Sequence, residues 1–186
     1  MKDDKSGFWK AICKDPDDDV PRLVFADYLD EQGQPERAEL IRAQCDVEAL
    51  PLSDPQRIDR EMTAERLLRQ NRFEWVEELP KWIQRSTVIF RRGFPYSIWA
   101  TPSEYARSCS SLAKSTVIQQ VDGFSNPFTD AHREKIEKSG HLPRVRGYAR
   151  PQATRPELEW MLTHATGLKE LSLFSPRGHG SDPSWL

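Results

Sequence analysis

The sequence predicts a mixed α and β protein: a helical N-terminal module over residues 1–84, then a short leucine-rich-repeat-like solenoid with parallel strands over residues 85–186. Three observations predict this class. Apolar residues recur at helical spacing through the first half. Short strand-like segments alternate with helix-start signatures in the second half. The last of these segments, Leu168-x-x-Leu171-x-Leu173, has leucine-rich-repeat spacing.

The first two helices flank an acidic turn. Phe8, Trp9 and Ile12 sit at helical spacing, and Asp15-Pro-Asp-Asp-Asp then provides turn and helix-start chemistry. A calcium loop is excluded, because the sixth position lacks glycine and the twelfth holds Ala26 instead of a bidentate glutamate. A helix from about residue 18 to 32 should follow. Its apolar arc is wide enough to predict a largely buried helix, and comprises Val20, Leu23, Val24, Phe25, Ala26, Tyr28 and Leu29.

The next boundaries are set by glycine and proline. Gly33 is expected to end the second helix, and Pro35 suits the first turn of the third. The third helix carries small and apolar residues on one face: Ala38, Ile41, Cys45 and Ala49. Asp54-Pro55 then starts a fourth helix, and a dense aromatic segment over residues 73–83 is expected to close a core.

Five strands and three helices are expected in the second half. The helices should begin at Thr101, Thr129 and Thr154, of which the first and last are followed by proline and glutamate as in a capping box. Strand centres lie about 20 to 27 residues apart, within the range of leucine-rich repeats. A single parallel α/β sheet remains the structural alternative. The expected strands are residues 87–90, 96–100, 117–121, 145–148 and 168–174.

Composition narrows the function classes. The chain is 37% hydrophobic and 30% charged, with no apolar run long enough for a membrane helix and no signal-peptide pattern, so the cytoplasm is expected. Three distant cysteines argue against a disulfide framework, and no cofactor or metal is expected. No phosphate-binding, dinucleotide, zincin or nucleophile-elbow motif is present. The one enzymatic hypothesis would pair Cys109 with His132 or His141.

Charge is distributed unevenly. Residues 1–80 hold 12 Lys/Arg against 20 Asp/Glu, and residues 81–186 hold 15 against 9, which gives −8 and +6 and sums to the net −2. On an extended strand, Arg144 and Arg146 would share one face around Val145. Such a basic surface suits an acidic partner, or it could dock on the acidic N-terminal half. The candidate binding residues are Arg133, Lys135, Lys138, Arg144, Arg146, Tyr148 and Arg150.

Part of the N-terminal half resembles a bacterial family. The run Asp15-Pro-Asp-Asp-Asp, Arg22-Leu-Val-Phe-Ala-Asp-Tyr-Leu and Glu31-x-Gly-x-Pro-x-Arg-Ala-Glu-x-Ile-Arg-x-Gln44 is similar to the repeat-companion domain, with Tyr28 where tryptophan is frequent. The resemblance covers 30 to 40 residues. It implies an all-helical module beside a repeat region, and it implies no reaction.

One feature of this segment predicts an internal ion-pair network. Asp27 falls at helical spacing from Val20, Leu23 and Val24, so a buried carboxylate is expected there, and a buried carboxylate needs a partner. Arginine is the partner that grips a carboxylate with two hydrogen bonds. The predicted structural network is Arg22, Asp27, Arg37 and Arg42. The functional alternative is a small recognition site made by Arg37, Arg42 and Gln44.

These observations together predict a non-enzymatic interaction or scaffold protein that binds a protein partner through the strand face of the repeat region. The alternative is nucleic-acid binding through the basic segment 133–155. No capping helix is expected after the last strand. That open C-terminal end could mediate self-association or partner docking.

Overall fold

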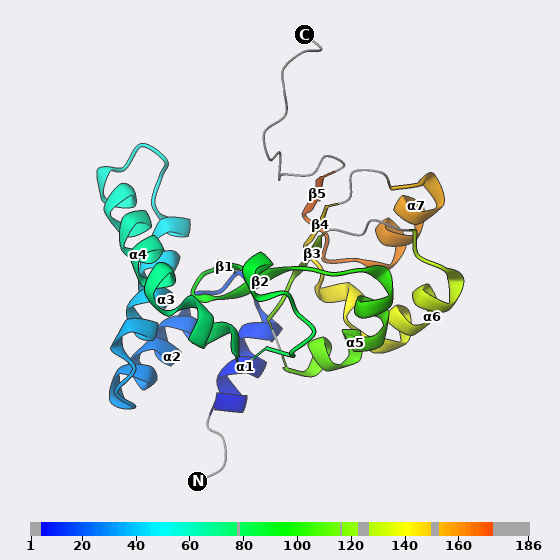
Figure 1. Ribbon diagram of the computed structural model, residues 1–186. Helices are drawn as coiled ribbons and strands as arrows, with labels where there is room; N and C mark the ends of the chain where they lie inside the picture. Colours follow the sequence, from blue (N-terminus) through cyan, green and yellow to red (C-terminus); the bar gives the residue numbers. More distant parts are fainter. Residues whose placement is uncertain (1–4, 78, 116, 123–126, 150–152, 173–186) are drawn as a thin grey trace. The chain divides into compact units, whose positions relative to one another are not determined.

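The computed structural model describes residues 5–77, 79–115, 117–122, 127–149 and 153–172 (Figure 1). Over these residues the chain forms seven α-helices and five strands, so the mixed α and β class is confirmed. The chain divides into two compact units. The first comprises residues 1–98 with 111–118, and the second comprises residues 99–110 with 119–186.

Four helices form the larger part of the first unit: α1 (Lys5–Lys14), α2 (Val20–Glu31), α3 (Pro35–Ala49) and α4 (Pro55–Glu77). The expected boundaries hold at the α2–α3 corner, where Gly33 adopts a φ of 73° and Pro35 opens α3. The α1 and α3 helices pack against α2, and α4 packs against α3. The core of this unit contains Ile12, Phe25, Leu29, Ile41 and Phe94.

Helix α2 is buried on one side only, so the prediction of a largely buried helix is wrong. Phe25, Ala26 and Leu29 face the core. The other half of the predicted apolar arc is exposed, with exposed fractions of 63% for Val20, 38% for Leu23 and 49% for Val24.

The first unit also includes a β-hairpin, so it extends beyond the boundary expected after residue 84. Strands β1 (Ile89–Arg91) and β2 (Phe94–Trp99) pair antiparallel, with Phe90 opposite Pro95. The aromatic segment before the hairpin packs against it: Trp75 of α4 contacts Phe90 of β1, with ring centroids 6.5 Å apart.

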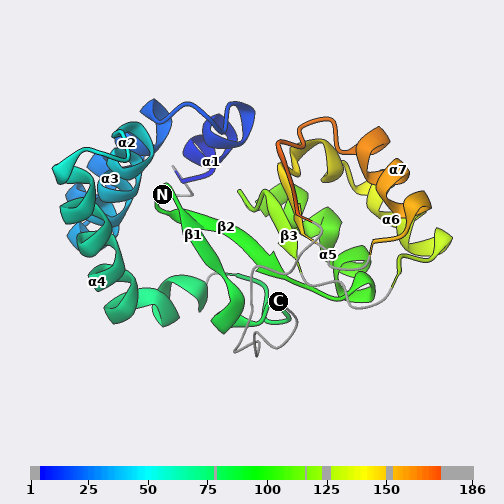
Figure 2. The ribbon, with the colours of Figure 1, turned by 90° about the horizontal axis from the view of Figure 1, so that it is seen from above.

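The second unit contains three short parallel strands in sequential order, β3 (Gln120–Asp122), β4 (Gly147–Ala149) and β5 (Glu170–Ser172). Helix α6 (Asp130–Ser139) joins β3 to β4, and α7 (Arg155–His164) joins β4 to β5. Both helices lie on the same side of the strands (Figure 2), as crossovers of one hand between sequential strands require. Helix α5 (Pro102–Ser115) begins in this unit.

The three expected helix starts are present with different capping. Thr101 and Glu104 form the expected reciprocal contacts, with Glu104 Oε2 accepting from the Thr101 backbone N–H at 2.9 Å. Thr129 caps α6 together with His132, and Gly140 closes that helix at a φ of 70°. Glu157 does not cap α7, because its side chain is fully buried and turns toward the core.

Parallel α/β structure is shown, but a leucine-rich-repeat solenoid is not. The strands have three residues each and begin at 120, 147 and 170, so successive starts are 27 and 23 residues apart. Leu171 of the predicted leucine pattern is 42% exposed. Leu173 and the expected open C-terminal end lie outside the described residues.

Candidate functional site

The tip of the β1–β2 hairpin makes unusually close contact with α3. Arg92 and Gly93 have φ values of 50° and 81°, as a two-residue hairpin turn with two left-handed positions requires. A Cβ on Gly93 would lie 2.6 Å from the Cα of Ile41. The turn therefore needs glycine for both its backbone conformation and its distance from α3.

Two polar side chains of α3 hold the hairpin. The Gln44 side chain accepts from the Gly93 N–H at 2.7 Å and donates to the Phe90 carbonyl at 3.3 Å, so it replaces a strand in satisfying the hairpin backbone. One turn further along α3, Glu48 accepts two hydrogen bonds from Arg91, at 2.8 and 2.9 Å. This is the bidentate geometry that makes carboxylate–guanidinium pairs strong.

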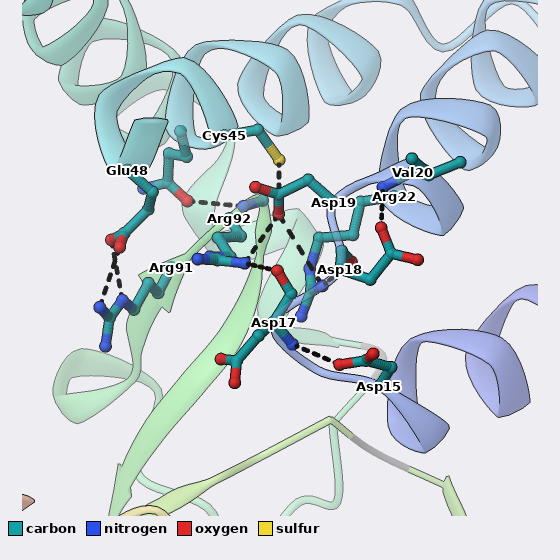
Figure 3. A network of polar contacts seen from close by, with 12 residues as sticks. Asp15, Asp17, Asp18, Asp19, Val20, Arg22, Cys45, Glu48, Arg91 and Arg92 are labelled. Atoms are coloured by element: carbon teal, nitrogen blue, oxygen red, sulfur yellow. Dashed lines mark hydrogen bonds and ion pairs between the residues drawn. The ribbon is translucent and has the colours of Figure 1, made fainter. Parts of the chain in front are cut away.

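The acidic turn between α1 and α2 holds the other side of the hairpin tip (Figure 3). Arg92 donates to the Asp17 carbonyl at 2.7 Å and to the Asp19 carboxylate at 3.0 Å. The same carboxylate lies 4.0 Å from Arg22 and accepts from the Cys45 thiol at 3.5 Å. Asp18 accepts from the N–H of Val20, the first residue of α2, while the N-cap residue Asp19 makes no side-chain capping hydrogen bond. The acidic run therefore holds both the start of α2 and the hairpin tip.

Arg37 of α3 also contacts the hairpin, through its aromatic side chains. Its guanidinium carbon lies 4.8, 5.3 and 5.8 Å from the ring centroids of Trp75, Phe90 and Phe94, and the residue is 9% exposed. Such contacts between a cation and aromatic faces strengthen as water is excluded. We call the set Asp19, Arg37, Gln44, Glu48, Arg91, Arg92 and Gly93 the hairpin joint.

The chemistry of the hairpin joint suits packing better than a reaction. The Cys45 thiol contacts the joint through Asp19, and burial raises the pKa of this thiol to about 12. The nucleophile of cysteine catalysis is the thiolate, which needs a pKa below about 8.5. Burial lowers the pKa of the Arg22 guanidinium, and the positive charge of nearby Arg92 lowers it further.

The Glu48–Arg91 pair should make stability depend on acidic pH. The hydrogen bond from Arg91 lowers the pKa of Glu48 below its ordinary 4.5. A lowered folded-state pKa contributes stability above the ordinary pKa that is lost as pH falls through the lowered value. We expect Glu48→Gln to be less stable than wild type in urea unfolding at pH 7, with the difference shrinking below pH 4.5. The control is Glu65→Gln, at an exposed position of α4. A stability difference between Glu48→Gln and wild type that stays the same at acidic pH would contradict the prediction.

The predicted ion-pair network does not form as one unit. Asp27 is 72% exposed and pairs with Arg42 at 2.6 Å, which also pairs with Asp30 at 2.7 Å. Arg22 instead contacts the acidic turn, and Arg37 contacts the aromatic rings. The expectation of a buried Asp27 is wrong because the apolar spacing on which it rested belongs to the exposed side of α2. Arg37 and Gln44 meet at the hairpin joint, and Arg42 lies outside it.

The candidate binding residues of the second unit fall into separate places. Arg133, Lys135 and Lys138 lie on α6, where Arg133 pairs with Asp130 at 3.6 Å and Lys138 pairs with Glu134 at 2.5 Å. Lys135 is exposed. Much of the predicted α6 charge is therefore matched locally.

Tyr148 is not a surface residue, so its assignment as a binding residue is wrong. It is 2% exposed and donates to Glu157 Oε1 at 2.5 Å. Because strand β4 begins only at Gly147, Arg144 belongs to a short 3-10 helix (Leu142–Arg144) and not to the strand. Arg144 is exposed, Arg146 is half-buried and Val145 between them is buried. Arg150 lies outside the described residues.

Sequence reasoning missed Lys169. The Gln119 carbonyl accepts from the N–H groups of Arg146 and Gly147, at 2.7 and 3.1 Å, and the Arg146 carbonyl accepts from those of Lys169 and Glu170, at 2.8 Å each. Lys169 therefore occupies the position in its repeat that Arg146 occupies in the preceding one. Aligning the β–α units by their strand starts would have found it. We call Arg144, Arg146 and Lys169 the basic edge.

The contacts of Cys109 and of the histidines do not favour the thiol–imidazole hypothesis. The Cys109 thiol donates to the carbonyls of Ala106 and Lys135. The His141 ring instead contacts the Tyr105 hydroxyl at 2.7 Å, and His132 accepts from the Thr129 N–H. A hydroxyl–imidazole pair also exists in catalytic sites, but burial, more than the nearby Cys109 and Tyr148, raises the pKa of Tyr105 well above its usual value.

Among the described residues, no group of three or more His, Cys, Asp or Glu side chains is placed to hold a metal ion. No helix in the described part of the chain is long and apolar enough to cross a membrane. Comparison with family models, curated proteins and solved structures gave no match for this chain. The repeat-companion resemblance therefore stays a prediction.

Proposed function

We propose that the protein is a non-enzymatic, cytoplasmic interaction protein that binds an acidic segment of a protein partner along its basic edge. The observation that carries this proposal is the register of the second unit. Arg146 and Lys169 occupy equivalent positions at the starts of neighbouring parallel strands, and neighbouring strands are about 4.8 Å apart. Two neighbouring cations give this edge a positive potential that is complementary to the carboxylates of an acidic chain.

The repeated hydrogen-bond pattern also supports a solenoid-like organisation of this unit. The same carbonyl position accepts two N–H groups at each step from one strand to the next. Both connecting helices lie on one side (Figure 2). In repeat proteins, such stacking presents equivalent side chains in rows, and these rows are the usual binding surface. We therefore place the partner along the row of strand starts, in a short leucine-rich-repeat-like arrangement.

Nucleic-acid phosphates are the second class of anion that a basic edge could bind. The charge on α6 favours the protein partner, because Arg133 and Lys138 already pair with carboxylates of their own helix. A phosphate-binding surface would gain affinity from many unmatched cations.

The test compares two labelled probes in fluorescence anisotropy, a polyglutamate peptide and a single-stranded DNA of equal charge. We expect wild type to bind the peptide at low salt. The double variant Arg146→Gln/Lys169→Gln should bind it about fivefold or more weakly, because each exposed charge pair contributes up to about 1 kcal/mol. The control Lys10→Gln/Lys81→Gln removes the same charge from exposed positions of the first unit and should bind as wild type does.

Two results would reject this function. If the edge variant binds as the control does, the basic edge is not the binding surface. If the DNA binds with a steep salt dependence and the peptide does not bind, the partner is a nucleic acid.

A further inference from the structure

The outward face of α2 carries three neighbouring apolar side chains that the first unit leaves in water. Leu23 and Val24 follow Val20 by three and four residues, the spacing at which side chains adjoin on a helix. The exposed fractions of Val20, Leu23 and Val24 are 63%, 38% and 49%. A contiguous exposed apolar patch of this kind is typical of a surface that a partner covers.

The same face continues into carboxylates toward the C-terminal end of α2. Asp27 and Glu31 follow Val20 by seven and eleven residues, so both lie within about 20° of it around the helix axis, and Asp30 adjoins them. The single cation of α2 is Arg22, which is 3% exposed and does not reach this surface. The outward face of α2 is therefore apolar at one end and acidic at the other.

Arg42 of α3 reduces this negative charge without cancelling it. Its guanidinium pairs with Asp27 at 2.6 Å and with Asp30 at 2.7 Å. Glu31 has no ion-pair partner among the described residues, so the three carboxylates and one guanidinium sum to a formal charge of −2. Carboxylates are also unfavourable in the last turn of a helix, where the macrodipole is negative. A cation from a partner would therefore offset a cost that α2 bears alone.

We call Val20, Leu23, Val24, Asp27, Asp30 and Glu31 the α2 patch, and we infer that it binds an amphipathic, basic helix of a protein partner. A helix that packs along α2 presents its own apolar side chains every three or four residues, which suits the ridge of valines and leucine. Its lysine or arginine side chains would then meet the carboxylates, which lie about 10 to 16 Å further along the axis at 1.5 Å per residue.

The exposed apolar residues of α4 lack this combination. Ile58 and Met62 are 60% and 63% exposed, but Glu65 and Arg69 follow them on the same face with opposite charges. A basic helix would meet repulsion as well as attraction there. The α4 face therefore serves as a matched control, because it has similar apolar exposure and no charge of one sign.

Fluorescence anisotropy with a labelled model peptide tests this inference. The peptide carries leucines at helical spacing on one face and lysines elsewhere, and a second peptide replaces every lysine with glutamate. We expect wild type to bind the lysine peptide and not the glutamate peptide. Val20→Ser/Val24→Ser should bind the lysine peptide about tenfold more weakly, because two valines no longer contribute apolar contact. The control Ile58→Ser/Met62→Ser should bind it as wild type does.

Glu31→Lys separates binding from folding. A cation in the last turn favours the helix, so this variant should be at least as stable as wild type in urea unfolding. It should nevertheless bind the lysine peptide about fivefold more weakly, because like charges then meet at the contact. The control Glu65→Lys reverses an exposed charge on α4 and should bind as wild type does.

Three results would overturn the inference. The first is wild type that does not bind the lysine peptide. The second is an α2 variant that binds this peptide as its α4 control does. The third is equal binding of the two peptides, because the partner would then not be basic. The α2 patch lies in the first unit and the basic edge in the second, so neither test decides the other.

Discussion

Replacing Gly93 with alanine should destabilise the first unit by about 3 kcal/mol, because two separate costs add. The left-handed conformation costs a non-glycine residue about 1–2 kcal/mol, and forcing a methyl group into a filled space costs about 1–3 kcal/mol more. Gly93 has a φ of 81°, and its added Cβ would meet the Cα of Ile41 at 2.6 Å. Because the obstacle includes backbone, a side-chain rotation cannot relieve it.

Gly33→Ala separates the two costs. Gly33 has a φ of 73°, but nothing lies within 4 Å of its added Cβ. Its substitution should therefore cost only the conformational strain, about 1–2 kcal/mol. Urea unfolding of the three proteins measures both effects. If the two variants lose equal stability, the close approach of the hairpin to α3 does not exist in solution.

The boundaries of the helices could be predicted because local chemistry sets them. Glycine in the left-handed conformation, proline in a first turn and threonine at an N-cap act within a few residues. Gly33, Pro35, Thr129 and Gly140 accordingly lie where the sequence places them. The mixed α and β class could also be predicted, because apolar residues recur at helical spacing in the first half, whereas short strand-like segments alternate with helix starts in the second.

The faces of the helices could not be predicted, because burial depends on which neighbours arrive. The arc of α2 is apolar on two sides, and the sequence alone cannot show that only one is covered. The error propagated to Asp27, which was expected inside because its apolar neighbours were. Tyr148 shows the converse: a tyrosine among arginines looks exposed, yet Glu157 satisfies its hydroxyl in the core.

The hairpin joint was also beyond sequence reasoning, although Asp19, Arg37 and Gln44 had been noticed for other reasons. Gln44 and Gly93 are 49 residues apart, and no local pattern connects them. The alternative of a recognition site made by Arg37, Arg42 and Gln44 stays untested: Arg37 and Gln44 both contact the hairpin, and Arg42 pairs with Asp27 and Asp30. Arg37 and Gln44 meet at the hairpin as parts of the packing of the unit, and the basic edge of the second unit carries the proposed binding.

Arg37→Ala should be the second strongly destabilising change, by about 2–4 kcal/mol. The substitution removes the cation from three aromatic faces and leaves a buried gap where α3, α4 and the hairpin meet. Arg37→Lys should recover part of this loss, because it keeps the charge and loses the flat guanidinium that stacks on the rings. Thermal and urea unfolding measure the series.

Asp27→Ala and Arg42→Ala are the matched comparisons. They break a pair in which the aspartate is 72% exposed and the arginine 31% exposed, so each should cost less than about 1 kcal/mol. Removing one partner of a buried ion pair would instead cost about 3–5 kcal/mol. The order of losses therefore separates the two accounts of this helical unit. If Asp27→Ala destabilises more than Arg37→Ala, α2 is buried through its aspartate face, and the pairing of Asp27 with Arg42 is not an exposed one.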